Sequence, residues 1–360
     1  MRRLAGLLFC LLAICAPAEA HEITFGQLDI HVGASSTVIE VKLPDLALIQ
    51  EEPSSLPPGT TAEMLAAPLS SEISAAVSRL VTERLRLTAN GIPVPLSVTD
   101  ITASDADIDV TLSAAALSGA LTVDANLFPT DPLHKVFANV YRSEELLGQY
   151  ALDQQNPSFS FDGLPRPLLD VIGTFVLEGI RHIFIGPDHI LFVIALILLG
   201  GPLWSQLKIV TSFTVAHSVT LVLATLDIVR LPSQLIESVI ALSIIVVGLH
   251  DLWRLQQSAQ VRRRPDIRVV FAFGFGLIHG FGFASVLAEL ALPQDALVWS
   301  LAAFNVGVEI GQVAIVLVAA PIILFITRYA PGMVARATLS AGAGVVVFMG
   351  SVWLWERLAG

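Results

Sequence analysis

The pattern of hydrophobic and polar positions changes once along the chain. From His21 to about Leu164, apolar and polar residues alternate in short runs, which indicates β-strands. After Pro165 the apolar blocks reach about 20 residues, the length that a helix needs to cross a bilayer. We therefore predict a mainly α membrane protein: a six-helix or seven-helix transmembrane bundle preceded by an exported β-sandwich domain. The predicted domains are 1–20, 21–165 and 166–360.

The region from 21 to 165 has the alternating strands and the turn residues that are typical of a β-sandwich. In 28–32 the apolar residues fall on one face, whereas Asp29 and His31 fall on the other, the side we expect to be wet. A turn at 33–35 leads to a second alternating run, so we predict a hairpin. A helical insertion is expected at about 61–84, between further strands.

The extreme amino terminus reads as a secretory signal. Arg2 and Arg3 precede an apolar run, and Ala18–Ala20 provides small residues for cleavage. The mature chain would then begin at His21. Both cysteines fall in the removed segment, so we expect neither a disulfide nor a thiolate ligand in the exported protein.

Six apolar blocks are predicted to span the membrane. They lie near 175–200, 204–226, 233–253, 267–290, 297–326 and 336–355. With the amino-terminal domain outside, the connections that carry most of the arginines face the cytoplasm, as the positive-inside rule requires. We expect the bacterial inner membrane, with the amino-terminal domain in the periplasm.

Composition supports the same class. Hydrophobic residues make up 54% of the chain and charged residues 14%, and the formal net charge is −11. Soluble domains hold a larger charged fraction, and an acidic chain is a poor partner for nucleic acid. The lipid bilayer is the expected environment.

Ionisable side chains within these spans are the main candidates for chemistry, because burying one in hydrocarbon costs at least about 2.5 kcal/mol. The predicted metal-binding residues are His182, Asp188, His189, His217, His279 and Glu309, with Glu178 and Asn305 as supporting groups. We expect them to converge on one pocket from several helices. The same groups would also suit a proton relay, since histidine titrates near neutral pH.

The first span has a polar interruption. Gly186-Pro187 predicts a break, after which Asp188 lies at the positive end of a new half-helix, as in transporters with discontinuous spans. Glu178 and His182, four residues apart, share one face of the preceding helix. The alternative is an interfacial amphipathic helix capped by Asp188.

Later spans each carry a polar centre. Thr214 and Ser218 flank His217, and four glycines around His279 would let a neighbouring helix approach closely. Asn305 and Glu309 stand at i and i+4, bracketed by glycines. Imidazole and carboxylate donors suit nickel, cobalt, zinc or copper better than magnesium or calcium, and the sequence does not rank those four metals. For each histidine alone, a hydrogen-bonding strut is the competing interpretation.

These segments resemble the HupE/UreJ family, in its branch with an exported domain. The resemblance runs from about Gly173 to the carboxyl end and rests on 179–192, 213–218, 237–243 and 276–284. It adds Glu237 as a supporting residue. The family's short members are regarded as nickel or cobalt permeases and accessory proteins of hydrogenase and urease. Their His-Pro-x-x-Gly-x-Asp-His signature aligns on His182, Gly186, Asp188 and His189, although Ile183 replaces the proline.

A second metal contact is expected in the exported domain. Cleavage would give His21 a free α-amino group beside its imidazole, a pair that favours copper, and His134 would be its partner. The competing interpretation is that both are solvated surface histidines. If the contact forms, the domain would capture metal and pass it to the bundle.

Three function classes remain open at this point. The first is a metal permease, and the second is an intramembrane zinc hydrolase with a metal-activated water near Ser218. The third is a membrane assembly factor. Its partner would be a periplasmic metal donor or a metalloenzyme maturation factor.

Overall fold

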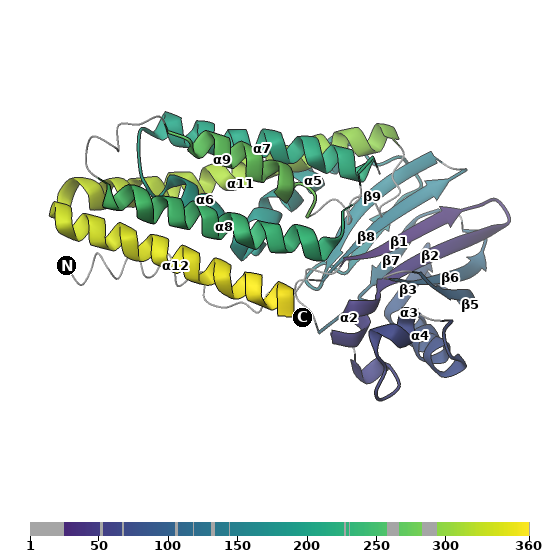
Figure 1. Cartoon of the computed structure of the whole chain (residues 1–360). Coiled ribbons are helices and arrows are strands. Elements are labelled where there is room, and N and C mark those ends of the chain that lie inside the picture. Colours follow the sequence, from purple (N-terminus) through teal and green to yellow (C-terminus); the bar gives the residue numbers. More distant parts are fainter. Residues whose placement is uncertain are drawn as a thin grey trace. The chain divides into compact units, whose positions relative to one another are not determined.

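The computed structural model describes residues 25–50, 53–66, 68–104, 107–117, 119–130, 134–143, 145–226, 228–229, 231–257, 266–282 and 294–359. The chain forms two compact units, one built mainly of strands up to Thr174 and one of the helices from Phe175 onward (Figure 1). The proposed signal segment 1–20 and His21 lie outside the described residues.

The β-rich unit contains two sheets. The larger has the order β5-β6-β2-β1-β8-β9, in which β1 and β8 are parallel and the other neighbours antiparallel. Its strands are β1 (Phe25–Val32), β2 (Ser36–Pro44), β5 (Ser97–Ala103), β6 (Asp107–Ala115), β8 (Lys135–Arg142) and β9 (Glu145–Asp153). The smaller is antiparallel, with the order β10-β7-β3-β4. Its strands are β3 (Leu85–Ala89), β4 (Ile92–Val94), β7 (Leu121–Ala125) and β10 (Ser158–Phe161).

One hydrophobic core joins the two sheets. Leu28 and Ile30 of the larger sheet and Leu87 and Val123 of the smaller one belong to it, which follows from the alternation of apolar residues along each strand. Short helices complete the unit: α2 (Asp45–Gln50), η1 (Pro53–Ser55), α3 (Ala62–Ala66) and α4 (Ser71–Arg84). The β1–β2 hairpin and the helical insertion were predicted correctly.

One expectation for this unit was wrong. The outer face of β1 was expected to be wet, but Gln27 is 8% exposed and Asp29 is 7% exposed. His31 on the same face is partly buried and stacks on Tyr141. Strand β8 is buried on both faces along almost its whole length.

The second unit is helical. Its helices are α5 (Leu168–Ile185), α6 (Pro187–Ile197), α7 (Leu203–Thr225), α8 (Ser233–Gln256), α9 (Arg268–His279), α11 (Gln294–Tyr329) and α12 (Gly332–Ala359). Four of these, α7, α8, α11 and α12, are long and apolar enough to span a membrane, and α5 with α6 forms a pair bent by 76° that passes the same test together.

The six or seven spans expected from the sequence are therefore not confirmed among the described residues, which contain four spans, or five if the bent pair counts as one. The break expected at Gly186-Pro187 is present, because α5 ends at Ile185 and α6 begins at Pro187. Helix α9 covers only the first half of the predicted span 267–290, and most of the second half lies outside the described residues.

Candidate intramembrane histidine site

The junction of α5 and α6 positions the first two candidate residues. Pro187 occupies the first turn of α6, where its missing amide hydrogen costs nothing. The Asp188 carboxylate accepts hydrogen bonds from the backbone nitrogen of His189 at 2.8 Å and from its ring Nδ1 at 3.0 Å. A side chain at Gly186 would lie 2.5 Å from that Nδ1 atom. Glycine at this position therefore leaves room for the Asp188–His189 pair.

Close packing of α9 on α7 positions two further candidate residues, His217 and His279. A Cβ atom at Gly276 would lie 2.6 Å from the backbone oxygen of Phe213, and one at Gly280 would overlap the backbone oxygen of His217. The absence of these side chains lets the two backbones meet, as the glycine pattern predicted. The approach brings His217 of α7 and His279 of α9, which are 0% and 1% exposed, into the same buried region.

Four imidazoles from α7, α5, α6 and α9 form a row. Ring centroids are 6.4 Å apart for His217 and His182, 4.6 Å for His182 and His189, and 5.6 Å for His189 and His279. We call these four residues the histidine row. Phe192 and Phe213 lie against His279 with centroid distances of 4.9 and 5.1 Å, so the row has an aromatic lining.

The hydrogen bonds of His279 define which ring nitrogen carries a proton. Ser243 of α8 donates its hydroxyl proton to the backbone oxygen of Ile240 at 2.6 Å, and the same oxygen lies 3.1 Å from His279 Nε2. Because the serine proton is already committed, His279 Nε2 must donate, which leaves Nδ1 as the bare lone pair of a neutral imidazole. That Nδ1 atom is buried and has no hydrogen-bond partner among the described residues.

His189 is oriented in the same way. An ionised carboxylate only accepts hydrogen bonds, so the contact with Asp188 assigns the proton to Nδ1 and leaves Nε2 with the lone pair. Histidines that bind metals usually donate their second ring nitrogen to a carboxylate or similar group, which fixes the tautomer. In this arrangement Asp188 orients His189.

His217 is the least satisfied member of the row. Both of its ring nitrogens are buried without a hydrogen bond in the described part of the chain. Its polar neighbour Asn305 of α11 donates to the backbone oxygen of Leu301 at 2.9 Å, and the Asn305 Oδ1 atom is likewise buried without a partner. A buried polar atom without a partner costs about 1–3 kcal/mol, so these atoms would gain from a bound water or ion.

A charged group lies beside the Asp188–His189 pair. The Arg357 guanidinium of α12 is 4.0 Å from Asp188 and 3.4 Å from Glu237 of α8, and its backbone oxygen accepts from Gln234 at 3.2 Å. The last turn of α12 is thereby tied to the first turn of α6. Glu237, the residue added by the family resemblance, pairs with this arginine.

Two other predicted acids have partners outside the row. Glu309 of α11 accepts a hydrogen bond from Thr211 of α7 at 2.5 Å, and Glu178 pairs with Arg181 on the same helix at 3.1 Å. Among the described residues of the helices, no three histidine and acidic side chains place a donor atom each within 4.8 Å of one another. The geometry is therefore a row of neighbouring imidazoles, and the single convergent pocket that we expected stays a prediction.

Sequence reasoning missed two contributors to the histidine row and one buried acid outside it. Ser243 and Arg357 are ordinary helix residues in the sequence, and only the packing of α8, α9 and α12 gives them their partners. Asp251 of α8 was missed as well, although a carboxylate inside an apolar block is a visible signal. It is 0% exposed, and its Oδ1 lies 3.3 Å from Nδ1 of His250.

The second metal contact expected in the exported domain, between His21 and His134, cannot be traced in the described residues. His134 is buried, 3% exposed, with its ring 4.0 Å from that of Phe128, and its expected partner His21 lies outside the described residues. Ser218, named for the hydrolase alternative, donates its hydroxyl proton to the backbone oxygen of Thr214 at 2.7 Å.

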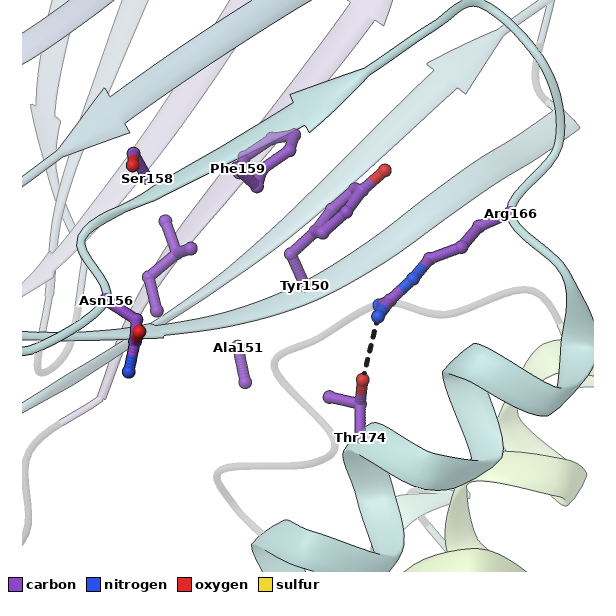
Figure 2. A pocket seen from close by; sticks show the side chains of 8 residues that line it. Tyr150, Ala151, Asn156, Ser158, Phe159, Arg166 and Thr174 are labelled. Atoms are coloured by element: carbon purple, nitrogen blue, oxygen red, sulfur yellow. Dashed lines mark hydrogen bonds between the residues drawn. The ribbon is translucent and has the colours of Figure 1, made fainter.

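A small pocket in the β-rich unit is lined by side chains that contact one another (Figure 2). Arg166 stacks over the Tyr150 ring at 4.7 Å and donates to Thr174 at 3.0 Å and to the backbone oxygen of Gln149. Tyr150 in turn stacks on Phe159. Because the guanidinium already has these acceptors, the pocket offers no free cationic group for a ligand.

The helices and the histidine row match one known family. The family model described as HupE / UreJ protein matches residues 164–357. The chain belongs to the HupE/UreJ family. The match covers all helices of the second unit apart from the last residues of α12. No curated protein matches the chain. Membership and the apolar helices together identify a HupE/UreJ membrane protein.

Proposed function

We propose that this HupE/UreJ protein binds a first-row divalent metal ion at the histidine row and carries it across the bilayer. The substrate class is nickel, cobalt, zinc or copper, since neutral imidazole is a good ligand for each. The observation that supports the proposal best is the buried Nδ1 atom of His279. Ser243 holds it in the unprotonated form that a metal requires, and no described protein atom uses its lone pair.

The spacing of the row favours stepwise transfer. Neighbouring rings stand 4.6 to 6.4 Å apart, so an ion bound to one imidazole is within reach of the next after a small side-chain rotation. Conduction requires binding that is strong enough for entry and weak enough for exit, which several partial sites achieve better than one closed site. Asp188 acts here as a positioning residue for His189. Asn305 of α11 lies beside His217, at one end of this path.

The proposed orientation places the β-rich unit in the periplasm of a bacterium and the bundle in its inner membrane. A signal peptide at 1–20 and the distribution of arginines support this topology. A periplasmic metal donor or a metalloenzyme maturation factor would then be the natural partner class.

Transport by purified protein in liposomes tests the proposal. A metal-sensitive dye is enclosed in the liposomes, and nickel, cobalt, zinc or copper is added outside. The measurement is made with the lumen more acidic than the outside and again with the gradient reversed. We expect dye response with the unaltered chain and a loss of at least about tenfold for His189→Ala and His279→Ala. Ser238→Ala is the matched control, because the bond this hydroxyl makes among the described residues is to Gln234 of its own helix.

The alternatives give different results in the same experiment. Metal that binds at the row but never crosses would indicate an accessory role. One tightly held zinc per chain together with turnover of an added lipid would indicate the hydrolase. Failure of all four metals to bind or cross, with correctly folded protein, would contradict the proposal.

A further inference from the structure

A second group of metal-type donors lies on the outer face of the β1–β2 hairpin. Asp29 of β1 is directly opposite Glu40 of β2 in the antiparallel register, and His31 is two residues along β1, on the same face. Each of the three side chains offers a donor atom that lies within 4.8 Å of the other two. The three residues are separate from the histidine row, in the other compact unit of the chain.

The pairing of Asp29 with Glu40 is electrostatically unfavourable by itself. Like charges directly opposite on neighbouring strands destabilise a sheet, and Asp29 is also 7% exposed. Lys42, two residues from Glu40 along β2, interacts electrostatically with Asp107. A cation between the two carboxylates would relieve the repulsion.

Buried amides hold the Asp29 carboxylate in place. Asn139 of β8 donates to Oδ1 at 2.8 Å, Gln27 donates to Oδ2 at 2.7 Å, and Gln149 of β9 donates to Asn139 at 3.4 Å. Carboxylates that bind metals are commonly fixed by such hydrogen bonds. The Gln27 Oε1 atom, on the same amide that reaches Asp29, is buried and has no partner among the described residues.

The imidazole is oriented as well. The ring of His31 stacks on Tyr141 of β8 with a centroid distance of 4.8 Å and an interplanar angle of 9°. Glu40 is exposed and His31 partly exposed, so an ion can reach the group from solvent. Rigid strands, an oriented ring and a hydrogen-bonded carboxylate together form a preorganised set of three donors.

We propose that Asp29, His31 and Glu40 form a second metal site, which binds a first-row divalent transition metal on the outer face of the six-stranded sheet. One nitrogen and two oxygen donors favour these metals over magnesium and calcium. With donors at about 2.1 Å from the ion, the donor atoms come to within about 4.2 Å of one another. Small rotations of His31 and Glu40 provide this closure, and water completes the coordination shell.

The site stands independently of the histidine row, so its test must separate the two. The full-length chain carrying His189→Ala and His279→Ala is titrated with Co²⁺ and with Cu²⁺ in detergent. Visible absorption of Co²⁺ and nitrogen couplings in the electron paramagnetic resonance spectrum of Cu²⁺ report the ligands. We expect one equivalent to bind through one histidine nitrogen, and Mg²⁺ or Ca²⁺ at the same concentration not to displace it.

Variants then assign the binding. His31→Phe keeps an aromatic ring on Tyr141 and removes the nitrogen, and Glu40→Gln removes one carboxylate. Each should weaken binding at least about 100-fold, since even loss of a supporting group costs 10–100-fold. Glu145→Gln, an exposed acid on β9 of the same sheet, is the matched control and should bind normally.

Stability gives a readout that does not depend on the row. Metal should raise the unfolding temperature of the Glu145→Gln control but not that of Glu40→Gln. Without metal, Glu40→Gln should unfold at a temperature no lower than that of the control, because the two opposed carboxylates are no longer both present. The original chain should bind one equivalent more than its His31→Phe variant. Unchanged binding in His31→Phe and Glu40→Gln, or no binding by a folded control, would overturn the proposal.

Discussion

Gly276→Ala and Gly274→Ala form a pair of substitutions that tests the helix contact beneath the histidine row. Both glycines lie inside α9, two residues apart. A Cβ atom at Gly276 would lie 2.6 Å from the backbone oxygen of Phe213 and 3.0 Å from the Ala216 Cβ, whereas one at Gly274 would meet nothing within 4 Å. Carbon and carbonyl oxygen normally stay about 3.3 Å apart, so α9 must move away from α7 by roughly 0.7 Å.

The magnitude follows from two opposing effects. Replacing glycine by alanine within a helix stabilises it by about 0.8–1 kcal/mol at either position. Overpacking at Gly276 costs about 1–3 kcal/mol more, since the obstacle is backbone. The helix preference is common to both variants, so the difference in unfolding free energy between them isolates the contact. We expect Gly274→Ala to be the more stable by about 1–3 kcal/mol.

The assay is unfolding of the purified chain in detergent, followed by circular dichroism, together with metal titration of the folded protein. Gly276→Ala should also bind metal more weakly, because movement of α9 displaces His279 from its place in the row, whereas Gly274→Ala should bind normally. Equal stability and equal metal affinity for the two variants would refute the contact between α7 and α9 on which the row depends.

Three further predictions concern single partners of the helical unit. Ser243→Ala removes the acceptor that fixes the His279 tautomer and should weaken metal binding about 10–100-fold in an equilibrium titration; equal affinity to Ser238→Ala would count against the assigned tautomer. Arg268→Ala leaves the backbone oxygens of Leu196 and Gly200 without their buried donor and should lower the unfolding free energy by about 1–3 kcal/mol. Arg268→Lys should recover little of it, because lysine lacks the planar fork, and full recovery would contradict this role. Arg357→Gln removes a fixed positive charge 4.0 Å from Asp188 and should tighten metal binding, most clearly at low salt; weaker binding would show that the arginine mainly holds α12 against α6.

Local patterns in the sequence were enough to predict several secondary-structure elements and some details of how they are broken or packed. The alternation around Leu28 and Ile39 predicted the β1–β2 hairpin, and Gly186-Pro187 predicted the break between α5 and α6. The glycines around His279 predicted close helix packing, which occurs at Gly276 and Gly280 but not at Gly274. Such features depend on a few adjacent residues, and their physical causes act locally.

Partners from distant parts of the chain were beyond that reasoning. Ser243 and His279 come from different helices, and nothing in either segment specifies that they meet. The buried outer face of β1 was missed because alternation distinguishes two faces but does not say whether the polar face is also covered. Asp29 and Glu40 lie opposite each other only through the hairpin register, and Asn139, 110 residues further along the chain, reaches Asp29 from the parallel strand β8. Parallel pairing leaves no short-range signal in a sequence.

X-ray absorption at the metal edge tests the central claim most directly, because it reports which atoms surround a bound ion. The sample is the full-length chain carrying His31→Phe, loaded with one equivalent of Ni²⁺ or Co²⁺, so that the histidine row is compared without the proposed second site. We predict scattering from at least one imidazole at about 2.0–2.1 Å, with a loss of bound metal or of that scattering in His279→Ala and His189→Ala. A bound ion with oxygen neighbours only, unchanged in both variants, would contradict the account.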